Sequence, residues 1–111
     1  MRAVAREPIM STYTMPTCAD TLELLDLVAD HMVDEFGISR AEAVARINEQ
    51  WHGQDLSDED DIILHEDERF WAFTIYYGDV PDWTPEADRT SWLPKAPPAP
   101  GSVFWTVPAT S

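Results

Sequence analysis

The chain has 111 residues and a formal net charge of −14, with 21 Asp and Glu against 7 Lys and Arg. This length predicts one small domain, and the charge excludes nucleic acids and anionic membranes as partners, because their phosphates are repelled by an acidic surface. The single cysteine, Cys18, excludes an intrachain disulfide, and the absence of any apolar run of membrane-spanning length or readable secretory signal leads us to expect a cytoplasmic protein.

The acidity is concentrated in the middle of the chain. Residues 18–79 hold seventeen Asp and Glu but three Arg, whereas the acids and bases of the two ends cancel. We predict a flexible N-terminal segment over residues 1–17 and one acidic domain over 18–111. Within this domain, we expect residues 18–78 to form a helical core and the Pro- and Trp-rich residues 79–111 to form a tail that packs on it.

A first helix is predicted from about Asp20 to Phe36. Thr17 or Asp20 is expected to cap its start, and Gly37 supplies its C-terminal stop. Apolar residues recur at steps of three and four, which is the spacing of one helix face: Leu22, Leu25, Ala29, Met32 and Phe36. Five acids, called the acidic row below, recur at the same steps on another face: Asp20, Glu23, Asp26, Asp30 and Asp34.

A second helix follows almost at once. Ser39 and Glu42 have the spacing of a capping box, and Gly53 closes the helix, which gives a helical hairpin or a helix-turn-helix. The second possibility suggests DNA binding through four residues of the second helix: Arg40, Arg46, Asn48 and Gln50. We reject DNA binding, because a DNA-binding helix needs a basic surface around it to hold the phosphates. Here the neighbouring first helix presents the acidic row instead.

Residues 54–61 form an acidic loop that suggests a calcium site. An EF-hand that starts at Asp55 has Asp60 at the sixth place, where the sharp turn needs glycine, and a start at Asp58 puts Ile62 at a ligand position. We therefore predict a solvated loop, and no metal, cofactor or catalytic residue anywhere in the chain. The acids of the loop are Asp55, Asp58, Glu59, Asp60 and Asp61.

A third, aromatic element covers residues 66–77, and two interpretations of it remain open. The aromatic and β-branched residues of 70–77 favour a strand. Three acids at 66–68, where a helix begins, and Gly78 at its end favour a helix, and we slightly prefer the helix. The expected fold class is thus mainly α: a small single domain with a helical hairpin, this third element and the packed tail.

The tail holds seven of the nine prolines, which argues against long regular elements. Thr84, Pro85 and Glu86 have the order of an N-cap, a first helical residue and a favourable acid, so a short helix to about Ser91 is expected. Residues 94–100 should be extended. We expect three aromatic residues of the tail to pack on the core: Trp92, Phe104 and Trp105.

Several short motifs within residues 22–78 resemble a group of short uncharacterised proteins from high-GC actinobacteria. No activity, cofactor or catalytic residue is attached to that group, so the resemblance implies nothing about function and favours only a helix over 66–77. The motifs are Phe36-Gly37-Ile38-Ser39, Glu42-Ala43, Arg46-Ile47-Asn48, Trp51, His65-Glu66, Trp71-Ala72 and Ile75-Tyr76-Tyr77-Gly78.

Two functional hypotheses follow, and the oligomeric state stays open in both. The first is a non-catalytic protein-binding module, of the immunity or inhibitor type, that presents the acidic row and the acidic loop to a basic protein. The alternative is a small-molecule-binding or enzymatic domain with an aromatic pocket near residues 70–77. Its candidate lining residues are His65, Trp71, Tyr76 and Tyr77. A third interpretation is that the charge serves solubility alone.

Overall fold

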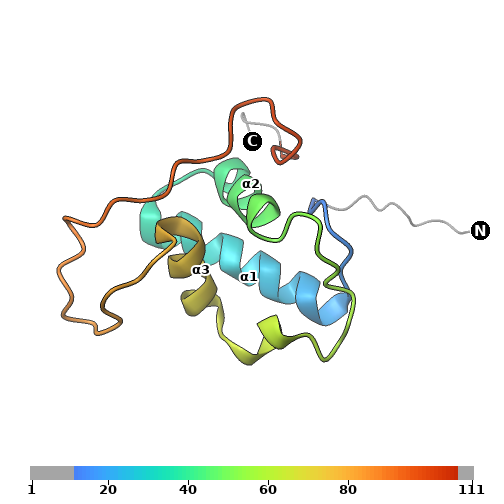
Figure 1. The fold of residues 1–111 in the computed structure, drawn as a ribbon, viewed down its shortest axis with the longest axis horizontal. Coiled ribbons are helices and arrows are strands. Elements are labelled where there is room, and N and C mark those ends of the chain that lie inside the picture. The colour runs from blue at the N-terminus through green and yellow to red at the C-terminus, as the bar shows by residue number, and fades with distance from the viewer. Residues whose placement is uncertain (1–11, 108–111) are drawn as a thin grey trace, which may run out of the picture.

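Three α-helices and one 3-10 helix make up the regular structure of residues 12–107, the part of the chain that the computed structural model describes (Figure 1). They are α1 (Ala19–Phe36), α2 (Arg40–Gln50), the 3-10 helix η2 (Ile62–His65) and α3 (Glu68–Tyr77). α1 packs against each of the other three. The described residues contain no strand, only an isolated parallel bridge between Thr17 and Leu56. The predicted mainly α fold is confirmed.

α1 begins one residue earlier than the sequence suggested. Its N-cap is Cys18, whose backbone N–H donates to the Thr21 hydroxyl oxygen at 2.9 Å. The expected caps, Thr17 and Asp20, are therefore wrong. The stop at Gly37 is confirmed: its φ of 68° lies in the left-handed region that glycine adopts without strain.

The third element is a helix, and the strand alternative is wrong. Asp67 caps α3 by accepting a hydrogen bond from the backbone N–H of Phe70 at 2.9 Å, and Gly78 ends the helix with a φ of 82°. The capping box of α2 is likewise confirmed on its serine side, because the Ser39 hydroxyl accepts from the Glu42 N–H at 3.0 Å. Local capping chemistry thus outweighs the β propensity of the aromatic run.

The hydrophobic core lies between the three α-helices. α1 contributes its side chains at steps of three and four, which puts one face inward along its whole length. Fully buried members are Leu25, Val28 and Met32 of α1, Val44 and Ile47 of α2, and Ala72 of α3. Leu22 is not among them: we expected it on the apolar face of this helix together with Leu25 and Met32, but 38% of it is exposed.

Residues before α1 belong to the core as well. We predicted a flexible segment over residues 1–17, and residues 1–11 of it lie outside the described residues. Residues 12–17 differ from the prediction, because Tyr13 and Met15 are buried in the core and the Pro16 carbonyl accepts the Leu56 N–H at 2.8 Å. Two large apolar side chains thus hold this segment, so the domain begins before Cys18.

The tail leaves α3 as a loop and then returns across α2 (Figure 1). It is fastened to α3 where the Lys95 N–H donates to the Tyr76 carbonyl at 2.8 Å, and the Trp92 ring meets Tyr77 edge-on at 5.3 Å. Farther along, Phe104 meets the His52 ring at 5.1 Å. The prediction of an irregular tail packed on the core is confirmed.

The short helix expected over residues 84–91 is wrong, since this part of the tail contains only turns. Asp82 accepts the Thr84 N–H at 2.9 Å, and Asp88 accepts the Thr90 N–H at 3.0 Å. The Arg89 guanidinium donates to the Thr84 carbonyl at 3.0 Å. Side chains thus bind the Thr84 carbonyl and the Thr90 N–H, two backbone groups that a helix over these residues would have used.

Candidate functional site

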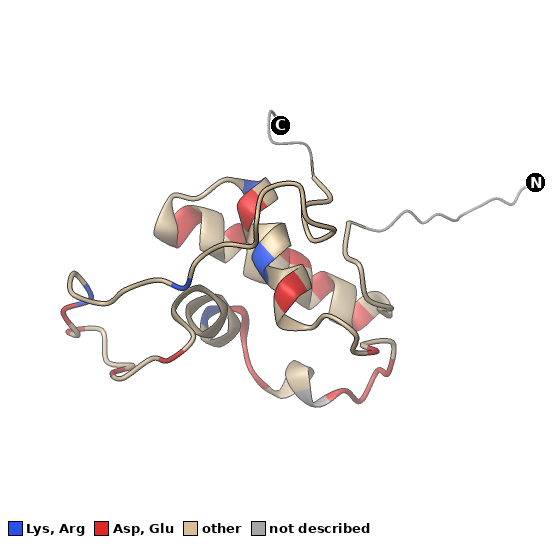
Figure 2. Ribbon diagram, turned by 45° about the horizontal axis from the view of Figure 1, so that its top comes forward, with Lys and Arg blue, Asp and Glu red and all other residues tan. Residues whose placement is uncertain are grey.

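The acidic row lies along the face of α1 that points away from the core. Acidic residues are spread over this helix, the acidic loop and the start of α3 (Figure 2). Asp26 is half-buried, and the other four members of the row are exposed. The sequence therefore grouped these five residues correctly on one helix face.

Part of this row is already neutralised within the domain. The Arg40 guanidinium, at the start of α2, contacts both Asp30 and Asp26, with a distance of 3.4 Å to Asp26. Asp26 also accepts a hydrogen bond from the Tyr13 hydroxyl at 2.8 Å. Within residues 12–107 no ion pair involves the remaining members, Asp20, Glu23 and Asp34. These three carboxylates are the members of the acidic row that pair with no cation of the described residues.

The burial of Tyr13, together with its hydrogen bond to Asp26, makes the fold sensitive to alkaline pH. Burial raises the pKa of Tyr13 far above its usual value, and the hydrogen bond to Asp26 raises it further. In the unfolded chain this phenol ionises near pH 10, so above that pH the unfolded state loses a proton that the folded state keeps. Stability that is present below about pH 10 is therefore lost as the pH rises.

We expect Tyr13→Phe to flatten the fall in the free energy of unfolding between about pH 9 and pH 11. Urea unfolding followed by far-UV circular dichroism at several pH values measures this slope. Tyr77→Phe is the matched control, because burial also raises the pKa of Tyr77, but that residue is much less buried. A slope that Tyr13→Phe leaves intact and Tyr77→Phe removes would contradict the assignment.

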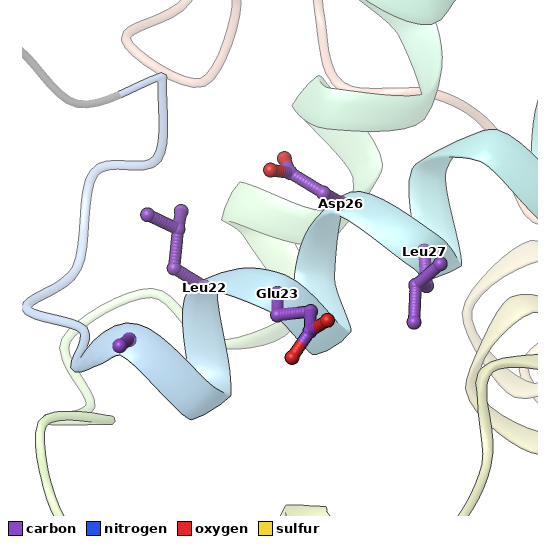
Figure 3. A pocket seen from close by; sticks show the side chains of 5 residues that line it. Leu22, Glu23, Asp26 and Leu27 are labelled. Atoms are coloured by element: carbon purple, nitrogen blue, oxygen red, sulfur yellow. The ribbon is translucent and has the colours of Figure 1, made fainter.

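Two leucines are exposed beside the acidic row. Leu22 is 38% and Leu27 is 43% exposed, and they flank an open depression of about 460 Å³ that Ala19, Glu23 and Asp26 complete (Figure 3). Leu22 and Asp26 project to one side of the helix, and Glu23 and Leu27 to the other. All five residues come from one helix, so the depression is an open feature of the surface and not an enclosed cavity.

The acids of the acidic loop serve mainly to shape the backbone. Asp55 accepts from the Ser57 N–H at 2.9 Å and from its hydroxyl, and these hydrogen bonds lower the pKa of Asp55. Asp58 accepts from the Asp60 N–H at 2.8 Å, and Asp61 caps η2 through the Ile63 N–H at 3.1 Å. Three of the five acids thus have structural roles. The other two acids, both exposed, are Glu59 and Asp60.

The tyrosines of the alternative aromatic pocket pack against other rings. The Tyr76 ring stacks on Phe36 at 3.9 Å between centroids, and the Arg46 guanidinium lies 4.8 Å from the Tyr76 centroid. Tyr77 meets the same Phe36 ring edge-on at 5.6 Å. Phe36 and Arg46 thus occupy the space beside these two rings.

The other two candidate pocket residues have different environments: Trp71 is packed against other residues, whereas His65 is exposed. The Trp71 indole N–H donates to the Ile63 carbonyl at 2.9 Å, and its ring meets Trp51 edge-on at 5.2 Å. His65 is exposed at the end of η2. The depression described above involves none of the four residues. The observed contacts of Tyr76, Tyr77 and Trp71 are packing contacts with other rings.

Arg46 is a residue whose importance sequence reasoning missed. It is 6% exposed, and its guanidinium holds the Glu42 carboxylate at 2.8 and 2.9 Å. It also donates to the Lys95 carbonyl at 2.9 Å, which fastens the tail to α2. This arginine is therefore taken up by the fold and offers no cation to a phosphate.

Asn48 fastens the segment before α1 and the tail to α2. Its side-chain oxygen accepts the Thr14 N–H at 2.9 Å, and its amide nitrogen donates to the Phe104 carbonyl at 2.9 Å. The side chain is completely buried. The residues around α2 that suggested DNA contacts thus hold the domain together.

Comparisons with known proteins give no match: no family model, no curated protein and no solved structure is significantly similar to this chain. The resemblance to the actinobacterial group gains no support from them. Among residues 12–107 no three His, Cys, Asp or Glu side chains gather as a metal site requires. None of the described helices has the length and hydropathy needed to span a bilayer.

Proposed function

We propose that this protein is a non-catalytic binding module that holds a basic partner protein, in the manner of an immunity protein or an inhibitor, on the outer face of α1. The observation that carries the proposal is the combination of exposed carboxylates and exposed leucines on one helix. Carboxylates accelerate the encounter with a basic partner and select it. Leucines supply the apolar area that gives an interface its affinity.

The charge of the whole domain supports this choice. A net charge of −14 on 111 residues creates self-repulsion that weakens the compact state. A basic partner relieves this repulsion when it binds. The acidic loop adds to the long-range attraction, whereas its hydrogen-bonded acids make it less suited to direct contact.

Affinity capture with matched charge variants tests the proposal. The baits are the wild type, a variant with Glu23→Lys and Asp34→Lys on α1, and a control with Asp79→Lys and Glu86→Lys on the exposed tail loop, which has the same change in charge. We expect the wild type and the control to retain a basic protein that the α1 variant loses. The association rate of that protein with the wild type should fall steeply between low and high salt, because the Debye length shrinks from roughly 30 Å at 0.01 M to about 3 Å at 1 M.

Two results would contradict the proposal. One is a captured protein that all three baits retain equally, because α1 would then not be the interface. The other is an association rate that does not change with salt, because a charge-steered encounter must depend on ionic strength.

A further inference from the structure

The depression on α1 has the geometry of a hole in helix–helix packing. Four of its lining residues are Ala19, Leu22, Glu23 and Asp26, at positions i, i+3, i+4 and i+7 of one helix. These are the four positions that surround a side chain of a facing helix in knobs-into-holes packing. Leu27, one residue further on, adds an apolar wall. The hole is open on the side of Ala19, because this residue has a single methyl group.

Arg40 shows how this face of α1 accommodates a cation. Its guanidinium reaches Asp26 and Asp30, which are one helical turn apart, and the three side chains are between 42% and 61% exposed. Toward the N-terminal end of α1, no cation among the described residues faces Glu23 and Asp20. The hole therefore lies at the end of the row where carboxylates are still available.

We infer that the partner of the proposed function binds here through an amphipathic helix with apolar residues at three- and four-residue spacing, flanked by Lys or Arg. An apolar side chain of this helix enters the hole between Ala19 and Leu22, and a flanking cation pairs with Glu23. The inference rests on the proposed function and adds the kind of structure that the partner presents. α1 has 18 residues and is about 27 Å long, so it offers a facing helix several turns of contact.

Charge decides between this occupant and a second copy of the chain. In a pair of α1 helices that face each other through this surface, Glu23 and Asp26 of each copy would meet the same acids of the other. Like charges at a helix interface destabilise it, and each chain carries −14 overall. An anionic bilayer is repelled for the same reason. A basic helix of another protein is the occupant that satisfies both the leucines and the carboxylates.

Peptide binding tests the inference with the full chain. The probe is a fluorescent helical peptide of about 20 residues, long enough to follow α1, made of Ala, Leu and Lys with the leucines in a heptad pattern. The first control peptide has the same composition in an order without an apolar face, and the second has Glu in place of every Lys. Fluorescence anisotropy gives the affinities, and amide chemical shifts show where the probe binds.

Ala19→Leu is the decisive variant, because it fills the hole and leaves the charge unchanged. Ala96→Leu, an exposed alanine in the tail, is its matched control. We expect the heptad peptide to bind the wild type at least about tenfold more tightly than either control peptide, and Ala19→Leu to weaken it by about tenfold, as loss of one buried leucine-sized contact does. Ala96→Leu should bind like the wild type, and shifts should centre on residues 19–27.

Other results separate this inference from the proposed function. If the heptad peptide does not bind, binds no better than the reordered peptide, or binds equally to Ala19→Leu, the helical partner is wrong. The proposed function survives that result if the Glu23→Lys and Asp34→Lys variant still loses the captured protein. If that variant retains the captured protein, the proposed function itself fails.

Discussion

Replacing Arg46 by methionine is expected to lower the free energy of unfolding by about 3 kcal/mol, because it removes one partner of a buried ion pair. Methionine restores most of the volume but none of the donors. Glu42, 25% exposed at its side chain, loses its cation, and the Lys95 carbonyl loses a hydrogen bond of 2.9 Å. The remaining exposure of Glu42 keeps the cost near the lower end of the range for such pairs, because water can reach the stranded carboxylate.

The matched control is Arg40→Met on the same helix. Arg40 also binds carboxylates, but its side chain is 42% exposed, and exposed ion pairs contribute at most about 1 kcal/mol. Urea unfolding monitored by far-UV circular dichroism measures both variants. Equal losses for the two arginines would show that burial does not set the cost. The structural role given to Arg46, as the buried link between Glu42 and the tail, would then be wrong.

A third variant separates charge from shape at this position. Arg46→Lys keeps the positive charge but loses the planar fork that reaches Glu42 and the Lys95 carbonyl together. Its free energy of unfolding should therefore lie between those of the wild type and Arg46→Met. The tail should loosen when the arginine is replaced, since the Lys95 carbonyl is one of the points at which α2 holds the tail. Faster amide exchange in the tail of Arg46→Met, measured at residues 95–105, would show that coupling.

Capping chemistry explains why the helices could be predicted from the sequence. Ser39 and Gly37 act through neighbours three or four residues away, so the signal is complete within a short window. The same holds for Asp67 and Gly78, whose caps decide the helix over the strand in α3. Such local rules failed over residues 84–91, where Asp82 and Asp88 form side-chain turns. The Thr84-Pro85 pattern does not reveal that competition.

Contacts between distant segments could not be predicted in this way. The partners of Arg46 and Asn48 in the tail lie 49 and 56 residues further along the chain. Nothing near either residue in the sequence indicates burial, because both are polar residues on an amphipathic helix. Tyr13 is a similar case: it precedes α1, and its burial depends on the packing of the whole core.

The acidic row of the candidate site could be predicted from the sequence, whereas the exposed leucines beside it were missed. The acidic row follows from helical periodicity, so its members fall on one face. Leu22 shares that periodicity with the core residues, which is why it was assigned to the buried stripe, but it lies at the edge of the stripe and remains 38% exposed. Leu27 falls between Asp26 and Val28 and matches neither pattern. A leucine among acids on the polar face was the available signal for an interface.

Asn48→Ala is expected to lower the free energy of unfolding by about 2 to 3 kcal/mol, because two backbone groups lose their partner at once. The Thr14 N–H and the Phe104 carbonyl are both bound to this buried amide. Alanine supplies neither a donor nor an acceptor, and it also leaves part of a completely buried volume empty. Thermal and urea unfolding measure the loss.

Hydrogen exchange distinguishes a clamp from simple loss of packing. We expect the Thr14 amide to exchange faster in Asn48→Ala, since its acceptor is gone, whereas amides within α1 change only with global stability. Asn48→Asp is the sharper variant, because it keeps the acceptor for Thr14 but offers the Phe104 carbonyl a carboxylate in place of a donor. It should retain protection at Thr14 and lose the attachment of the tail.

Gln50→Ala is the control for stability. This residue lies at the half-buried end of α2, and its replacement should change the free energy of unfolding by no more than about 0.5 kcal/mol. Protection at Thr14 that survives in Asn48→Ala would mean that the N-terminal segment is held by Tyr13 and Met15 alone.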